Sequence, residues 1–228
     1  MSKSISQMVP ENYDYDMPIL GAIENMFNYY TDTHKRTLVV RFDVRYPVSY
    51  GNDVKNEDIS KCMRKVIQYY KRLGNYDPFS LWVREQGNSQ HPHYHCCLLL
   101  NGKIVQNPYG VMNTVERLWG NTIGEPARGL IDHCTKSKYG TAHDNGIMLR
   151  STSEDYMTKL QEVINQVTYL AKVKDKGAYN DGLRNFGMSR IPSLNSQEAL
   201  QRHQAIELAT SQPPLFDIDP STLNLFGD

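Results

Sequence analysis

The stretch "HPHYHCCLLLN", residues 91–101, holds three of the chain's seven histidines and runs directly into an apolar segment. Side chains alternate between the two faces of a strand, so His93 and His95 project from one face and Tyr94 and Cys96 from the other. The apolar residues that follow favour a strand buried in the core. Two imidazoles on one face of a strand can reach the same divalent ion. The stretch therefore predicts a core strand and a metal site together.

A metal site needs a further ligand, and the preceding segment offers one. "PFSLWVRE" (78–85) has the pattern of a strand, joined to the histidines by the polar turn "QGNSQHP", so Glu85 lies across the expected hairpin. Two imidazoles and one carboxylate, with positions left for water and phosphate oxygens, suit Mg²⁺ or Mn²⁺ better than a closed structural zinc site. His91, beside Pro92, is expected in a loop or as a partner of a ligand. A bare His-x-His is also common as an accident of packing.

The rest of the chain supplies a sheet and helices around this strand. "RTLVVRFDVRYP" (36–47) alternates apolar and charged residues, as a half-buried strand does. The long helix expected at 151–177 begins with Ser153 as a cap and ends near Gly177. Further helices are predicted at 18–30, 56–74 and 108–120, and further short strands at 128–134 and 146–150. This order favours an α+β fold, with a central antiparallel sheet flanked by helices.

Composition narrows the class of protein. A chain of 228 residues with 39% hydrophobic content can bury one sizeable core. The sequence has no apolar stretch long enough to cross a bilayer and no secretory signal at its start, so we expect a cytoplasmic protein of a bacterial host cell with no membrane partner. The four cysteines lack CxxC spacing, which indicates reduced thiols rather than disulfides or a zinc finger.

The net charge of zero conceals an uneven distribution. Residues 1–30 carry a net charge of −3 and residues 191–228 a net charge of −4, which leaves +7 for the segment between them. A basic centre suits a body that binds polyanions, although chance segregation on a solvated surface gives the same pattern. We therefore divide the chain into an acidic extension with a short helix (1–30), a central domain (31–192) and a C-terminal helix with a disordered acidic tail (193–228).

A second candidate group lies on the long helix. "TYLAK" places Tyr169 and Lys172 three residues apart, on one helical face. A phenol, with a pKa of about 10, is a weak nucleophile unless a metal polarises the phosphate and a nearby cation favours phenolate. Lys174 and Lys176 follow, where DNA phosphates would lie. With 15 tyrosines in the chain, Tyr-x-x-Lys pairs also arise by chance, and Tyr156 begins another.

Taken in order, "RFDVRYP", the acidic residue before "HPHYHCCLLLN", "YLAK" and "NFGMSR" resemble the HUH endonuclease superfamily of rolling-circle replication initiators, closest to inovirus-type and prophage replication proteins. The resemblance covers roughly residues 35–190. It implies an antiparallel sheet of about five strands, the RRM-like palm of HUH endonucleases. It also implies nicking of single-stranded DNA at a replication origin through a 5′-phosphotyrosine intermediate. The residues that match the motifs are His93 and His95 as the metal pair, Glu85 as third ligand, Tyr169 as nucleophile and Lys172 as its helper.

The same resemblance gives the first strand a role. We expect Arg41 and Arg45 to hold DNA phosphates, while Asp43 orients them or a metal-ligating histidine. A surface ladder of salt bridges is the alternative. The chain shows no ATP-binding loop, so a helicase would come from the host.

The C-terminal tail suggests another partner. "TLNLF" (222–226) resembles the peptides with which bacterial proteins dock on the polymerase sliding clamp, with Leu223, Leu225 and Phe226 as anchors. The alternative is an unstructured end that folds back on its own domain.

Three functions remain to be separated by experiment. The first is a metal- and tyrosine-dependent DNA nickase and strand transferase that initiates replication of a phage or related mobile element. The second is a DNA-binding regulatory protein that keeps the fold without catalysis. The third is a metal-dependent phosphodiesterase that uses water, for which chelation abolishes activity but Tyr169→Phe does not.

Overall fold

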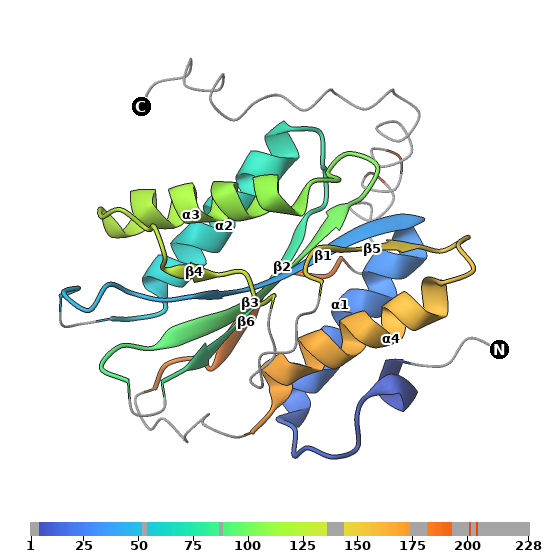
Figure 1. The fold of residues 1–228 in the computed structure, drawn as a ribbon, viewed down its shortest axis with the longest axis horizontal. Helices are drawn as coiled ribbons and strands as arrows, with labels where there is room; N and C mark the ends of the chain where they lie inside the picture. Colours follow the sequence, from blue (N-terminus) through green and yellow to red (C-terminus); the bar gives the residue numbers. More distant parts are fainter. Residues whose placement is uncertain are drawn as a thin grey trace.

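The computed structural model describes residues 5–192 apart from 52–53, 87–88, 136–143 and 174–181, together with residues 201 and 204. Its centre is a six-stranded antiparallel sheet in the order β4-β1-β3-β2-β6, with β5 paired to β1 beyond the end of β4 (Figure 1). The strands are β1 (Arg36–Val44), β2 (Phe79–Glu85), β3 (His93–Asn101), β4 (Ile131–Asp132), β5 (Ile147–Arg150) and β6 (Phe186–Met188). The expected α+β class and antiparallel sheet are confirmed, with one strand more than the resemblance implied.

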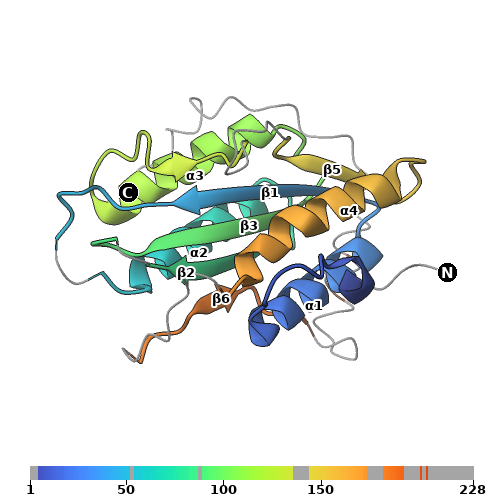
Figure 2. The same cartoon turned by 60° about the horizontal axis from the view of Figure 1, so that its bottom comes forward.

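Helices cover both faces of the sheet. Figure 2 shows α1 and α4 on one face and α2 and α3 on the other. The elements are η1 (Ile5–Met8), α1 (Met17–Thr33), α2 (Glu57–Arg72), α3 (Pro108–Ile123), α4 (Tyr156–Val167) and the 3-10 helix η2 (Thr168–Ala171). The helices predicted at 18–30, 56–74 and 108–120 are thus present, with ends moved by up to three residues. Among the residues that the structure describes, no helix has the length and apolar content needed to span a bilayer.

Strand β3 lies at the middle of the sheet and separates two hydrophobic cores. Its even-numbered side chains, Cys96, Leu98 and Leu100, pack with α2 and α3, and the odd-numbered Cys97 and Leu99 pack with α1 and α4. All five are fully buried. Burying one leucine stabilises the fold by about 1.5–3 kcal/mol, so "CCLLL" supplies much of what holds both layers to the sheet.

The long helix predicted at 151–177 is wrong in its extent. Helix α4 begins at Tyr156, after Asp155 rather than the predicted cap Ser153, and the chain tightens into η2 after Val167. The end is set by a distant segment: Asp16 N–H donates to Ala171 O at 2.7 Å and Val173 N–H donates to Asp14 O at 3.0 Å. Because these bonds pair the backbone with an extended segment, the helix does not continue through residues 172–173.

One expected division lies within a helix, and one strand was not predicted. The division at residue 30 falls inside α1, whose buried residues join the core against the sheet. Strand β6 was not predicted, because three residues are too few for a periodic pattern. Several residues singled out in the sequence lie outside the described part of the chain. They are Lys174 and Lys176, and the clamp-like residues Leu223, Leu225 and Phe226 of the C-terminal tail.

Candidate metal centre

The candidate site lies at one end of the sheet face that carries α1 and α4. On this face the middle of the sheet is apolar, with Val39 of β1, Leu81 and Val83 of β2, and Cys97 and Leu99 of β3 in the core. At the end that holds the site, polar and charged side chains take their place. The antiparallel register sets Asp43 of β1 opposite His95 of β3 and Glu85 of β2 opposite His93. The hairpin and its neighbour therefore bring two imidazoles and two carboxylates together on one rigid surface.

Three of these side chains can hold one metal ion. Ligand atoms of Glu85, His93 and His95 all lie within 4.8 Å of one another. Glu85 Oε2 is 2.7 Å from His95 Nε2, and Glu85 Oε1 is 3.7 Å from His93 Nε2. Ligands on opposite sides of one small ion are about 4.2 Å apart, so a small rotation of the side chains would suffice. The donor set of two neutral nitrogens and one carboxylate oxygen fits Mg²⁺ or Mn²⁺ with coordination positions left for other oxygens.

His95 is held by carboxylates at both ring nitrogens. Nδ1 lies 2.7 Å from Asp43 Oδ1 while Nε2 faces Glu85. Burial lowers the pKa of His95, but the hydrogen bonds to Asp43 and Glu85 outweigh it and leave that pKa raised. With a metal on Nε2, Nδ1–H would still donate to Asp43, which orients the ring and raises its basicity as a ligand. Asp43 thus has the geometry of the orienting residue.

His93 has the opposite electrostatic setting. Burial and the neighbouring His95 lower its pKa, and Arg45 lowers it further. Its side chain is 20% exposed, against 5% for His95. A neutral imidazole is the form that binds a metal, so His93 is already prepared for that role near neutral pH.

Tyr169 lies beside these ligands rather than in the interior. Its ring stands edge-on to the ring of His95, 5.6 Å between centroids, and the side chain is 41% exposed. The Arg41 guanidinium lies 4.8 Å from the centre of the Tyr169 ring and the Lys172 ammonium 4.5 Å. Because η2 has about three residues per turn, Tyr169 and Lys172 lie nearly in line. Two cations therefore contact the ring of Tyr169.

The N-terminal segment contributes a residue that the sequence did not reveal. Tyr15 forms a β-bridge with Lys172, and this pairing brings Tyr13 under the lysine, with Nζ 3.1 Å from the ring centre. The hydrogen bond and charge of Lys172 lower the pKa of Tyr13. Lys172 is therefore held between two tyrosine rings. The only sequence signal is the repeated "YDYD" at 13–16, which does not indicate a partner.

Of the remaining predicted residues, Arg41 lies at the site, whereas neither Arg45 nor His91 belongs to the cluster of ligands. The backbone of Arg41 is fixed at the site, because Asn145 Oδ1 accepts its N–H at 3.0 Å. The side chain of Asn145 thus fills the gap between β4 and β5. Arg45 lies just beyond β1 and is exposed. His91 does not share the face of the ligands, since its ring lies 6.1 Å from Tyr46 of the opposite core.

Residues 3–189 match the YagK/YfjJ C-terminal domain, which is most of the chain. The chain belongs to this family. One YagK-type relative, "Uncharacterized protein YagK" of Escherichia coli (strain K12), is 26% identical over 198 residues, with 74% of this chain and 90% of that protein covered. No solved structure matches the chain. The YagK/YfjJ region includes every described site residue, from Tyr13 to Lys172.

Asp43→Asn is expected to weaken Mn²⁺ binding by about 10–100-fold, because the neutral amide no longer raises the basicity of His95. Isothermal titration calorimetry measures this directly. Asp32→Asn, at an exposed position of α1 near the opposite end of β1, serves as the matched control and should bind Mn²⁺ as the unaltered chain does. Equal affinities for the two variants would contradict the orienting role of Asp43.

Proposed function

We propose that this chain nicks and rejoins single-stranded DNA at a replication origin, using Tyr169 as nucleophile and a divalent metal ion, Mg²⁺ or Mn²⁺, as cofactor. The process it would serve is the initiation of rolling-circle replication of a phage or related mobile element, as in the HUH endonucleases that the sequence resembles. The observation that carries the proposal is the position of Tyr169, half-exposed and next to His95 of the Glu85–His93–His95 cluster.

The chemistry suits the groups that meet here. In the proposed step the phenol oxygen of Tyr169 bonds to phosphorus, and the bond from phosphorus to the 3′ oxygen breaks. The phenol loses one proton and the departing 3′ oxygen gains one, so the products are a 5′-phosphotyrosine and a free 3′ hydroxyl. Reversal by another 3′ hydroxyl rejoins the strand. A bound metal ion would supply polarisation of the phosphate and neutralisation of its developing charge.

The protein's own side chains have separate tasks in this scheme. Glu85, His93 and His95 would hold the metal. Asp43 fixes the ring of His95 through Nδ1. Arg41 and Lys172 place positive charge beside the phenol, where it favours the phenolate and can also contact the phosphate.

Adduct formation tests this proposal. Single-stranded DNA from the replicon that encodes the chain is incubated with the protein and Mn²⁺, and the products are separated under denaturing conditions. A labelled band that moves with the protein and disappears after protease treatment is the expected result. Cleaved DNA without any adduct would indicate attack by water, and intact DNA that is bound in native gels would indicate a binding protein.

Tyr13→Ala is expected to slow adduct formation by roughly threefold, because Lys172 loses one of the two rings that hold its ammonium group. Tyr13→Phe keeps the ring and should retain most of the rate. Tyr109→Ala removes a tyrosine that is 72% exposed on α3 and is the matched control. Equal rates for Tyr13→Ala and Tyr109→Ala, measured from the initial accumulation of adduct, would exclude a role for the N-terminal segment.

A further inference from the structure

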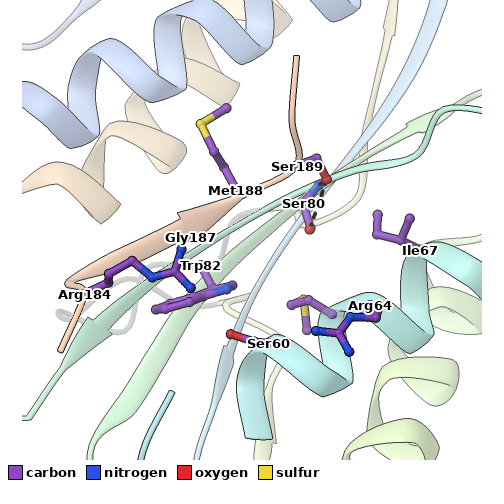
Figure 3. A pocket seen from close by; sticks show the side chains of 10 residues that line it. Ser60, Arg64, Ile67, Ser80, Trp82, Arg184, Gly187, Met188 and Ser189 are labelled. Carbon is purple, nitrogen blue, oxygen red and sulfur yellow. Dashed lines mark hydrogen bonds between the residues drawn. The ribbon is translucent and has the colours of Figure 1, made fainter. Parts of the chain in front are cut away.

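A hollow of about 280 Å³ lies on the opposite face of the sheet from the metal centre, between α2 and the edge strand β6 (Figure 3). Residues that line it include Ser60 and Arg64 of α2, Ser80 and Trp82 of β2, and Arg184 and Ser189, which lie before and after β6. None of these residues contributes to the site described above. The hollow therefore needs its own explanation.

The hollow depends on a glycine at the edge of the sheet. Gly187 pairs with Trp82, and a Cβ at this position would come within 2.6 Å of two indole carbons. Beside them, Ser80 and Ser189 are joined by backbone and side-chain hydrogen bonds, with their hydroxyl oxygens 3.3 Å apart. Hydroxyls can both donate and accept hydrogen bonds, so this surface can bind the mixed polar groups of a sugar or base.

Positive charge stands on both walls of the hollow. Arg64 and Arg184 are exposed and come from elements far apart in the sequence (Figure 3). The backbone beside the second arginine is fixed, because Asn56 Nδ2 donates to Arg184 O at 2.7 Å. Helix α2 carries three further exposed cations, Lys61, Lys71 and Arg72. Guanidinium groups on two sides of a hollow that is lined by both serine hydroxyls and apolar side chains fit a phosphate-bearing ligand.

The hollow is connected to the metal centre through the sheet itself. Val83 pairs with Phe186, and Arg84 N–H donates to Asn185 O at 2.8 Å. Arg184 follows one residue beyond this contact, near the end of β2 where Glu85, the carboxylate of the metal site, lies. Neighbouring strands are only about 4.8 Å apart. A DNA strand that leaves the metal centre over this edge therefore meets Arg184 first.

We propose that this hollow binds a nucleotide of the single-stranded DNA that flanks the phosphate at the metal centre. The inference rests on the proposed function, since it is the DNA path through that site that leads here. Arg64 and Arg184 hold phosphates, and the serine hydroxyls contact the sugar or base. The strand would thus pass around β6 from one face of the sheet to the other.

The test measures binding without catalysis. Fluorescence anisotropy of labelled oligo(dT) is recorded in the presence of EDTA, with the Tyr169→Phe chain as background. The double variant Arg64→Ala/Arg184→Ala is expected to bind about tenfold more weakly. Each lost phosphate contact should reduce the slope of log affinity against log salt by about 0.7, so the expected change is about 1.4. Arg117→Ala/Arg150→Ala, which removes exposed arginines from α3 and β5, is the control and should change neither quantity.

Each outcome decides one claim. The inference about the hollow would be overturned if the Arg64→Ala/Arg184→Ala variant kept its affinity and salt slope, or if the control lost as much. Failure of the background chain to bind oligo(dT) would also overturn it. The proposed nicking activity is judged separately, by adduct formation with Tyr169 intact. A chain that shows the expected salt effect but forms no adduct would keep the nucleotide site and lose the catalytic proposal.

Discussion

Replacement of Tyr169 by phenylalanine is expected to abolish the covalent protein–DNA adduct. The variant lacks the oxygen that would bond to phosphorus, while the ring that contacts His95, Arg41 and Lys172 remains. Because the packing is retained, binding of single-stranded DNA in EDTA should stay within about twofold of the unaltered chain. The measurement is the amount of adduct formed with Mn²⁺ under denaturing conditions.

A matched control separates this role from general loss of a tyrosine. Tyr156→Phe removes the hydroxyl of the other Tyr-x-x-Lys pair, at the opposite end of α4, and should form adduct as the unaltered chain does. Adduct formation by Tyr169→Phe would assign the nucleophile to another residue. Strand cleavage without adduct in both the Tyr169→Phe and the Tyr156→Phe variant would favour a phosphodiesterase that uses water.

Loss of a metal ligand is expected to have an effect of similar size. His93→Ala or His95→Ala should lower the rate of adduct formation by at least about 100-fold, because the ion that neutralises the phosphate is no longer held. Metal binding to the folded state also raises the unfolding temperature. The unaltered chain should therefore show a higher Tm in Mn²⁺ than in EDTA, and both variants should lose this difference.

Both single variants are measured, because His95 also stabilises the fold and its loss alone could act through folding. Its removal leaves Asp43 and Glu85 without the ring between them, whereas His93 is partly exposed and makes a longer contact of 3.7 Å. His91→Ala, in the same stretch of sequence but facing Tyr46, is the control and should keep the Mn²⁺-dependent rise in Tm. A rise that persists in His93→Ala and His95→Ala would place the metal elsewhere.

The grouping of Glu85, His93 and His95 could be predicted because it depends on local pattern. Alternation in "HYH" places His93 and His95 on one face, and a short hairpin brings Glu85 opposite without knowledge of the rest of the fold. The sequence suggested that Asp43 orients either the arginines or a ligand histidine, but it could not specify the contact with His95. It depends on the register of β1 against β3, two strands separated by α2 and β2, and no local pattern specifies that register.

The surroundings of Tyr169 show where sequence reasoning fails. Helical periodicity continues past Val167, and "AKVKDKG" contains no residue that stops a helix before glycine. The helix ends because residues 14–16 pair with residues 171–173. The same long-range pairing brings Tyr13 to Lys172, so one unpredicted contact accounts for both the wrong helix end and the missed residue. Tertiary hydrogen bonds outweigh the small local preferences on which such predictions depend.

The most direct test of the central claim is to locate the DNA on the protein. Adduct formed with Mn²⁺ and single-stranded DNA of the encoding replicon is digested with nuclease and protease, and the modified peptide is identified by mass spectrometry. The account predicts a nucleotide attached through its 5′ phosphate to Tyr169 and to no other residue. Attachment at another tyrosine, or a complete absence of modified peptide while the DNA is cut, would contradict it.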